Sequence, residues 1–291
     1  MKTNLIILNY NDAARTIKLA SKTANYDTID QVIIVDNAST DGSFDELKSL
    51  CSDKITVIAS PVNGGYAKGN NFGCLYALEH FSPDIIFVAN PDVSFGEATA
   101  AAMANALMTD RSLGIVAPIV NQGYNVWNLP GFIGMIESLF LVWFTLDKKF
   151  IRQNILKSRE KLVEVGVVEG SFYAFTAESY KRAKGFDERT FLYAEEIILA
   201  QRMRANGYHT AVLRDERYDH LHSASIRKHY HSSKAKTFPH FVKSFKIYNK
   251  HYLHTGKFED TIYDIACSAA YVERLVYDLA MRIKQALSDL I

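Results

Sequence analysis

Residues 32–42 read VIIVDNASTDG, an apolar run that ends abruptly in a polar cluster. The chain has three more short runs that are almost continuously apolar: residues 5–8, 55–58 and 85–88. Such runs are typical of strands that are covered on both faces, as in a parallel sheet. The segments between them have room for crossover helices: residues 13–24, 43–50 and 67–80. The sequence therefore predicts an α/β fold in which helices flank a single, mostly parallel sheet.

Polar clusters follow three of these runs, at residues 9–12, 36–42 and 90–92. Because ligands of open α/β sheets bind beyond the carboxyl ends of the strands, we expect the three clusters to meet at one crevice. Asp36 and Asp92 are the strongest candidates, since an acid at the end of an apolar strand needs a partner or a ligand. Other polar residues of these segments suit helix caps and turns: Asn11, Asp41 and Ser43.

The composition limits the classes of protein that fit. Of the 291 residues, 48% are hydrophobic and 22% are charged, which excludes a disordered or fibrous chain. A net charge of +1 gives the chain no polyelectrolyte character, so we expect no nucleic-acid partner. Three scattered cysteines fit a reducing compartment, and the short apolar run before Asn9 predicts no secretory signal. The sequence therefore indicates a globular protein of the cytoplasm.

Two common nucleotide-binding motifs do not occur in the sequence. A dinucleotide-binding fold needs G-x-G-x-x-G after the first strand, where this chain has LNYN at residues 8–11. The P-loop pattern G-x-x-x-x-G-K-[ST] occurs nowhere in the chain. These two facts argue against NAD binding and exclude a P-loop.

A series of further motifs lies between residues 4 and 225: ILNYN at 7–11, VDNASTDG at 35–42, NGG at 63–65 with GNN at 69–71, NPD at 90–92, GFDE at 185–188, FLYAEE at 191–196 and HLHSAS at 220–225. Together they resemble the inverting glycosyltransferases of family 2, which have the GT-A fold, and especially the rhamnosyltransferase-like branch of polysaccharide biosynthesis. The resemblance implies a GT-A catalytic domain over residues 1–225. Its nucleotide-binding half would be about 1–120 and its acceptor-side half about 121–225. Residues 226–291 would form a basic segment and a C-terminal helical extension.

The resemblance also implies which residues bind the nucleotide-sugar donor, for which a UDP or dTDP sugar is expected. Tyr10 would stack on the base, although a tyrosine at a strand end is as often part of the core. Asp36 would accept a hydrogen bond from a pyrimidine N–H. The remaining donor-binding residues that it implies are Asn9, Asn11, Asn63, Gly65, Lys68, Asn71, Asn90 and Asp92.

A divalent metal cofactor, Mn²⁺ or Mg²⁺, is implied in the same way. Residues 90–92 stand where GT-A enzymes carry an Asp-x-Asp motif, but the first acid is the neutral Asn90. Asp92 remains to bind a cation that bridges the two phosphates. His220 matches the late histidine of the family as a second ligand, with His222 as the alternative, and imidazole suits Mn²⁺ better than Mg²⁺.

The catalytic base is expected at Glu195 or Glu196, directly before the helix-like run 197–206. A helix N-terminus keeps a carboxylate anionic, and a neighbouring carboxylate raises one of the two pKa values toward neutrality. Acidic residues are common in the first turn of any helix, so the assignment of the catalytic base rests on the resemblance. The family has Glu-Asp here and an acid two positions later, whereas this chain has Glu196 and Ile198.

The region after the motifs points to partners. Residues 220–258 contain no acidic residue, eight Lys or Arg and seven of the nine His. This composition suits binding of the donor's diphosphate, of a lipid-diphosphate acceptor or of the inner leaflet of the membrane. The alternative is a basic face that is simply solvated. Within residues 121–165, which lack strand signals, an apolar run and a basic run suit a lipid-linked acceptor at a membrane surface or an insert packed on the sheet.

The last segment, residues 261–291, is predicted to be one long amphipathic helix. Its apolar stripe is Ile262, Ile265, Ala269, Val272, Val276, Leu279, Ile283 and Leu287. Acids outnumber bases along the segment, which argues against an anionic membrane as its partner. We therefore expect the helix to pack on the catalytic domain or to form a homodimer.

The sequence thus predicts a metal-dependent, inverting hexosyl- or deoxyhexosyltransferase. It would move a sugar from a nucleotide-diphosphate donor to a glycan or lipid-linked acceptor in cell-surface polysaccharide synthesis. The alternative is a catalytically degenerate protein of the same fold that only binds nucleotide sugars. This alternative is motivated by Asn90 and Ile198, which replace acids of the family pattern.

Overall fold

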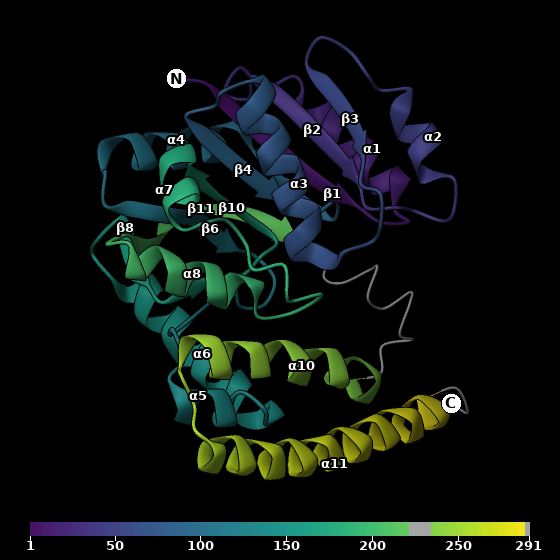
Figure 1. Ribbon diagram of the computed structural model, residues 1–291, viewed down its shortest axis with the longest axis vertical. Helices are drawn as coiled ribbons and strands as arrows, with labels where there is room; N and C mark the ends of the chain where they lie inside the picture. Colours follow the sequence, from purple (N-terminus) through teal and green to yellow (C-terminus); the bar gives the residue numbers. More distant parts are fainter. Residues whose placement is uncertain (221–233, 289–291) are drawn as a thin grey trace.

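The computed structural model describes residues 1–220 and 234–288 (Figure 1). Its N-terminal part contains four parallel strands: β1 (Thr3–Asn9), β2 (Gln31–Asp36), β3 (Ile55–Ala59) and β4 (Ile85–Ala89). Three helices connect them: α1 (Ala13–Thr23), α2 (Ser43–Lys48) and α3 (Gly65–His80). The predicted alternation of strands and helices is confirmed here, nearly residue for residue.

Beyond β4 the sheet is mixed rather than parallel. β10 (Phe172–Thr176) lies antiparallel between β4 and β6 (Leu113–Val120), and β11 (His209–His220) runs parallel to β6. β5 (Val93–Phe95) and β8 (Leu162–Val165) both pair antiparallel with β11. The strand order is β3-β2-β1-β4-β10-β6-β11-β5, with β8 beside β11 off this path. The predicted GT-A-like α/β architecture is present, and the antiparallel β10 interrupts its parallel strands between β4 and β6.

Helices cover both faces of this sheet (Figure 1). Successive strand residues point to opposite faces, so Leu5 and Ile7 belong to one hydrophobic cluster and Ile6 to the other. The first cluster includes α1 and α4 (Glu97–Thr109), and the second includes α3, α7 (Ala177–Arg182) and α8 (Glu195–Ala205). Burial on both faces explains why these strands read as continuous apolar runs.

The middle of the chain differs from its sequence reading. It contains α5 (Phe132–Glu137), α6 (Leu141–Lys157) and the strand β8, although no strand was expected there. A separate two-stranded sheet joins β7 (Val126–Trp127) to β9 (Val167–Val168). Such two- to four-residue strands are too short to give a periodic signal and form through their pairing partners.

Two helices form the C-terminal extension: α10 (Lys234–Tyr252) lies beside α8, and α11 (Lys257–Ser288) lies outside α10 as the outermost layer (Figure 1). They share a third hydrophobic cluster with α5 and α8. The predicted domain boundary at 225 and the alternative ligand His222 fall outside the described residues. None of the helices in the described ranges combines the length and apolarity needed to cross a bilayer.

The long C-terminal helix is confirmed, and it packs on the rest of the chain through a face other than the apolar stripe. The buried residues of α11 are Tyr263, Cys267, Ala270 and Arg274, on a different side of the helix. Most of the predicted stripe is exposed, for example Ile265 and Val276. The periodicity identified an apolar stripe correctly but could not show which of two apolar faces contacts the domain.

Candidate active site

The first two polar clusters meet at the ends of β1 and β2. Asn9 lies opposite Asp36 in the sheet register, and its Nδ2 donates to Asp36 Oδ1 at 2.9 Å. The backbone N–H of Ser39 donates to Asp36 Oδ2 at 2.9 Å, and Thr16 Oγ1 donates to Asn9 Oδ1 at 2.8 Å. Asn9 is fully buried and Asp36 is 2% exposed. Asn9 therefore orients the Asp36 carboxylate rather than facing solvent itself.

The loops that follow these two strands are tied to each other. Asn11 has a left-handed backbone, with φ of 55°, and its side chain bonds both the backbone N–H and the hydroxyl of Thr40, at 2.8 and 3.2 Å. Tyr10, beside it, is half-buried. Asp41 accepts the backbone N–H of Ser43 at 3.0 Å, which confirms a turn-forming role for that residue.

The glycine-rich segment before α3 connects this edge to a distant loop. Asn63 Oδ1 accepts from Asn37 Nδ2 at 3.0 Å and from the Gly65 N–H at 3.1 Å, and the Tyr66 N–H donates to the Phe191 carbonyl at 2.9 Å. Gly65 has φ of +82°, and a Cβ there would lie 2.0 Å from the Phe191 carbonyl oxygen. This position therefore requires glycine, which lets the two segments touch.

Two other predicted donor-binding residues lie on α3. Lys68 is exposed on its first turn. Asn71 is buried, and its amide donates to the Phe186 carbonyl and Glu188 Oε1 and accepts from Tyr180 Oη and the Phe186 N–H. An amide offers two donor hydrogens and two acceptor lone pairs, so all of its capacity is used within the protein. We infer that Asn71 positions the 185–188 loop and does not contact a donor.

The third polar cluster lies next to the end of β11. His220 Nε2 is 3.3 Å from Asp92 Oδ1, and its Nδ1 is 3.7 Å from Glu169 Oε2. Burial lowers the pKa of His220, but the hydrogen bonds and charges of Asp92 and Glu169 outweigh it and raise that pKa to about 9. The backbone N–H of Asn90 donates to the Ser171 carbonyl, two residues from Glu169. The predicted pair of Asp92 and His220 is thus in contact.

The contact of Asp92 with His220 fits a cation that takes its other ligands from substrate. Among the described residues, no group of three or more His, Cys, Asp or Glu is arranged to hold a metal ion. Two ligands about 2.1 Å from one octahedral ion lie about 3 Å apart, close to the 3.3 Å between Asp92 Oδ1 and His220 Nε2. These two donors therefore suit an ion completed by phosphate oxygens, which would replace the proton on His220.

The predicted base lies on a strained turn. Tyr193 and Ala194 have consecutive left-handed backbones, with φ of 72° and 67°, and α8 begins immediately afterwards at Glu195. Such conformations cost about 1–3 kcal/mol each and persist where surrounding contacts impose them. Burial, and then the charge of Glu196, raise the pKa of Glu195 well above its ordinary range. Glu195 is 5% exposed, whereas Glu196 is only half-buried.

Tyr66 lies between the predicted base and the segment that contains Glu169. Its hydroxyl donates to the Gly170 carbonyl, next to Glu169, and lies 3.2 Å from the Tyr173 hydroxyl. Burial raises the pKa of Tyr66, and the charges of Glu195 and Glu196 raise it further. The Tyr66 N–H also bonds the carbonyl of Phe191, four residues before Glu195. The groups predicted from separate parts of the sequence are therefore linked around one edge of the sheet.

Helix α10 holds the strained turn from behind. Ser244 Oγ donates to the Leu192 carbonyl at 2.8 Å, and the Phe241 ring lies 5.7 Å from that of Tyr193. Tyr252 Oη donates to Asp187 Oδ2 at 2.7 Å. Burial opposes ionisation of Asp187, but the bonds from Arg189 and Tyr252 lower its pKa. The C-terminal extension thus contributes to the geometry of the candidate base.

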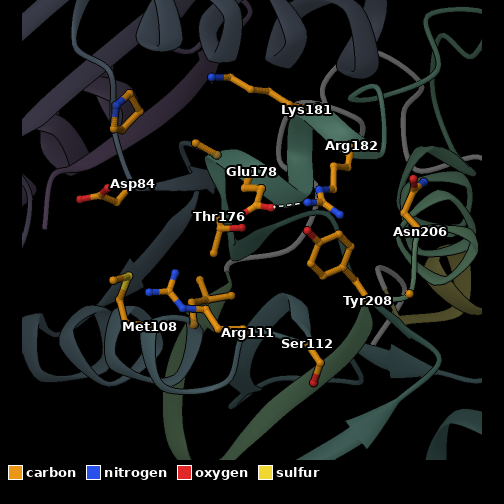
Figure 2. Close-up of a pocket in the computed structure, with 14 residues that line it drawn as sticks. Asp84, Met108, Arg111, Ser112, Thr176, Glu178, Lys181, Arg182, Asn206 and Tyr208 are labelled. Carbon is orange, nitrogen blue, oxygen red and sulfur yellow. Dashed lines mark ion pairs between the residues drawn. The ribbon is translucent and has the colours of Figure 1, made fainter.

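A pocket of about 920 Å³ lies elsewhere, at the opposite edge of the sheet (Figure 2). Its lining includes Asp84 before β4, Ser112 before β6, Thr176 at the end of β10, and Tyr208 before β11. Figure 2 shows the Glu178–Arg182 ion pair, 2.8 Å long, within it. None of the predicted site residues lines this pocket, so it is separate from the polar edge described above.

The family model described as glycosyl transferase family 2 matches residues 5–182, more than half of the chain. The chain belongs to glycosyl transferase family 2. The match includes β1 to β4 and Asp92, and it ends before the candidate base. This assignment confirms the family that the motifs resemble.

This glycosyltransferase is similar to two curated relatives. The low-salt glycan biosynthesis hexosyltransferase of Haloferax volcanii is 27% identical over 205 residues, which are 69% of this chain and 61% of that protein. The N-acetylglucosaminyl-diphospho-decaprenol L-rhamnosyltransferase of Mycobacterium tuberculosis is 26% identical over 192 residues, 61% of this chain and 62% of that protein. The matches thus span about six tenths of the length of these relatives.

Solved structures support the fold of this glycosyltransferase. A mannosyltransferase of Pyrobaculum calidifontis, in complex with GDP-Man and Mn²⁺, has a TM-score of 0.62 at 18% identity, covering 100% of this chain and 81% of that one. TarS of S. aureus has a TM-score of 0.51 at 14% identity, covering 94% and 81%. At these identities the similarity concerns the fold alone, and it confirms the GT-A prediction.

Sequence reasoning missed three residues of this glycosyltransferase's polar edge. Asn37 had a usable signal, since it follows Asp36 directly. Glu169 is an acid beside a glycine and a serine, and only the pairing of β10 with β4 brings it to His220. Tyr66 resembles any helix-core aromatic, and its link to Gly170 spans 104 positions.

Proposed function

We propose that this family 2 glycosyltransferase moves a hexose or deoxyhexose from a UDP or dTDP donor to a glycan or lipid-diphosphate-linked acceptor, with inversion of configuration. The observation that carries the proposal is the linkage of Asp36, Asp92, His220 and the Glu195–Glu196 turn around one edge of the sheet. Glycosyl transfer requires binding of the nucleotide, neutralisation of the departing diphosphate and a general base. The side chains proposed for these three roles belong to this edge.

Tyr10 and Asp36 would bind the nucleotide. An ionised carboxylate has about four acceptor positions, and the two bonds from Asn9 and Ser39 leave capacity for a pyrimidine N–H. These two bonds also fix the plane of the carboxylate before a donor arrives. Tyr10, half-buried directly after β1, would supply an aromatic face for the base.

Asp92 and His220 would hold the divalent ion, Mn²⁺ or Mg²⁺. When bound, the ion supplies positive charge that stabilises the departing nucleoside diphosphate. The Glu169 carboxylate, 3.7 Å from His220 Nδ1, would help to orient the imidazole through its negative charge. The exposed Lys68 supplies a further cation on α3 for the same phosphates.

Glu196 is proposed as the base that takes the proton of the acceptor hydroxyl. It lies at the N-terminus of α8, where the helix dipole favours the anionic form. Glu195 is more deeply buried, and burial raises its pKa and disfavours its anionic form, so it is the weaker candidate. As Glu196 removes the proton, the acceptor oxygen bonds to the anomeric carbon from the face opposite the diphosphate. The bond to the diphosphate breaks, and the configuration inverts.

The acceptor class rests on the relatives. One is named as a rhamnosyltransferase that acts on N-acetylglucosaminyl-diphospho-decaprenol, and the other as a hexosyltransferase of glycan biosynthesis. We extend a lipid-diphosphate or glycan acceptor to this chain on that basis. Such an acceptor would place the protein in the cytoplasm, in peripheral contact with the inner face of the membrane. Function in cell-surface polysaccharide synthesis follows from the same argument.

The second candidate function is binding of a nucleotide sugar without transfer. It is favoured by two sequence features, Asn90 in place of an acid and Ile198 in place of another. Ile198 is fully buried on α8, so no carboxylate could take its place without losing solvation. Either function uses the same donor site.

The test is turnover of purified protein with Mn²⁺ and a panel of UDP, dTDP and GDP sugars. The proposal predicts release of nucleoside diphosphate, by transfer or slow hydrolysis, from at least one pyrimidine donor. Loss of this release in Glu196→Gln, with full release in the exposed-site control Glu160→Gln, would support the assigned base. Donor binding without any release would favour the binding-only function, and absence of donor binding would contradict both.

A further inference from the structure

The outer side of α11 carries an unusual apolar pattern. Eight positions alternate at spacings of four and three residues, and we call them the α11 seam: Phe258, Ile262, Ile265, Ala269, Val272, Val276, Leu279 and Ile283. Six of them are large side chains more than half exposed, from 53% for Ile283 to 78% for Phe258. None of the eight is charged. Exposed apolar surface of this extent marks an interaction site.

The opposite side of α11 already contacts the rest of the chain. Tyr263, Cys267, Ala270 and Arg274 are buried there. The Arg274 guanidinium donates to the Leu139 carbonyl at 2.6 Å and lies 4.0 Å from the centroid of the Phe238 ring. These contacts fix the rotation of the helix about its axis. The seam therefore faces away from the protein, on the outermost layer of the molecule (Figure 1).

The acidic side chains in the described part of α11 all pair with other groups of the chain. They therefore present no unpaired charge to a partner of the seam. Asp260 and Asp264 pair with Lys250 and Lys246 of α10, at 3.3 and 2.6 Å. The other acids in the described part of the helix accept backbone N–H groups: Glu259 from Gly256, Glu273 from Leu141 and Asp278 from Ala235. The charges thus lock α11 onto α10 and α6 and leave the seam apolar.

The spacing identifies the kind of partner. Alternation of four and three gives a period of 3.5 residues, which keeps one narrow stripe in line with a second helix. A helix that lies on an anionic membrane instead carries Lys and Arg along its flanks. The α11 flanks carry acids and small residues such as Thr261, Ala266 and Ser268, which permit close helix approach, and the exposed Tyr271, Leu275 and Tyr277 extend the apolar surface beside the seam. The pattern therefore fits another helix better than a lipid surface.

We propose that the α11 seam pairs with the α11 seam of a second copy of this chain. A stripe that is uniformly apolar is complementary to itself, as a two-fold symmetric contact requires. The seam spans 26 residues of helix, about 39 Å at 1.5 Å per residue, which is long enough for a stable two-helix contact. β-branched residues occupy five of its eight positions, and they favour packing of this kind.

The test is the mass of the full chain in solution by light scattering and sedimentation. The proposal predicts a dimer, twice 32.8 kDa, for the wild type. The double variant Val272→Glu with Val276→Glu should weaken association by at least ~100-fold, because it buries unpaired charges at the contact. The control Leu75→Glu changes an exposed leucine on α3, 57% exposed and far along the chain, and should remain dimeric.

Two outcomes would overturn the proposal. A wild-type protein that is monomeric at tens of micromolar would do so. A monomer that binds anionic lipid vesicles through Val272 and Val276 would do so too, because that result would make the seam a membrane surface. A dimer unaffected by the double variant, with an unchanged circular dichroism spectrum, would do so as well. Should the double variant fail to fold, the wild-type mass and the single variant Leu279→Lys decide. Donor turnover plays no part in this test, so it stands apart from the proposed function.

Discussion

The two ends of the candidate site are built in different ways. At the nucleotide end, Asn9 and Asp36 are neighbours in the sheet register, so the pairing of β1 with β2 places them. At the base end, Glu196 follows two left-handed residues whose turn is held by Ser244 and Phe241 of α10. One end depends on the sheet, and the other depends on a helix that lies far along the chain. The C-terminal extension therefore supports the turn that precedes the proposed base.

The largest effect should come from Glu196→Gln, at the base end. Removing a general base lowers turnover by about 10²–10⁴-fold, while the amide keeps the shape of the side chain. Donor affinity should remain within about twofold, because the base acts on the acceptor. Steady-state kinetics together with calorimetric donor binding measure the two effects. A large loss of donor affinity would contradict the separation of the two ends.

Asp92→Ala tests the nucleotide end, where, unlike Glu196→Gln, the change should also lower donor affinity. It removes one of the two proposed metal ligands, so both donor affinity and the dependence of activity on Mn²⁺ should fall. We expect turnover to drop by about 100-fold and donor affinity by about tenfold, since the lost ligand would act on the bound donor and more strongly on the charge of the departing diphosphate. Metal titrations of activity measure this, and unchanged Mn²⁺ dependence would refute the role of Asp92.

Gly65→Ala tests the point at which the two ends touch. The new methyl group would meet the Phe191 carbonyl, and φ of +82° disfavours alanine, so we expect a loss of about 3 kcal/mol in the free energy of unfolding. Gly42→Ala is the matched control, because Gly42 has φ of +86° but open space around a Cβ. It should cost only about 1 kcal/mol. Equal losses in urea denaturation would mean that the close approach to Phe191 contributes nothing.

The pH dependence of stability distinguishes the two glutamates at the base end. Because the folded pKa of Glu195 is raised, the folded protein holds a proton that the unfolded chain releases above the ordinary glutamate range. Stability contributed by this group is therefore full below that range and is lost as pH rises toward the folded pKa. Glu195→Gln should flatten this decline and be more stable than wild type at neutral pH. A decline of the same slope in both proteins would contradict the burial of an uncharged Glu195.

The smallest effect should come from Ser244→Ala, which removes one hydrogen bond to the Leu192 carbonyl. Stability should fall by about 1 kcal/mol. Turnover should fall by roughly tenfold with an unchanged KM for the donor, because a small shift of the turn misplaces Glu196. Ser49→Ala removes a comparable exposed hydrogen bond on the helix after β2 and serves as the control. If both variants keep full turnover, α10 does not position the base.

The same contrast explains how much could be predicted from the sequence. β1 to β4 are covered on both faces, so their apolar runs predicted them, and their polar ends predicted Asp36 and Asp92. β10 could not be placed, because its position between β4 and β6 depends on pairing between distant segments. Without β10, nothing in the sequence brings Glu169 to His220. The same holds for Asn71, whose buried bonds to residues 180–188 are long-range and gave it a positioning role.

The proposed function depends most directly on where a nucleotide binds. A crystal structure of the protein with UDP and Mn²⁺ tests this in one measurement. We predict the uracil beside Tyr10 and Asp36, the diphosphate and ion at Asp92 and His220, and the terminal phosphate facing the Glu196 turn. A nucleotide bound instead in the pocket of Figure 2, with Asp36 and Asp92 untouched, would contradict the account.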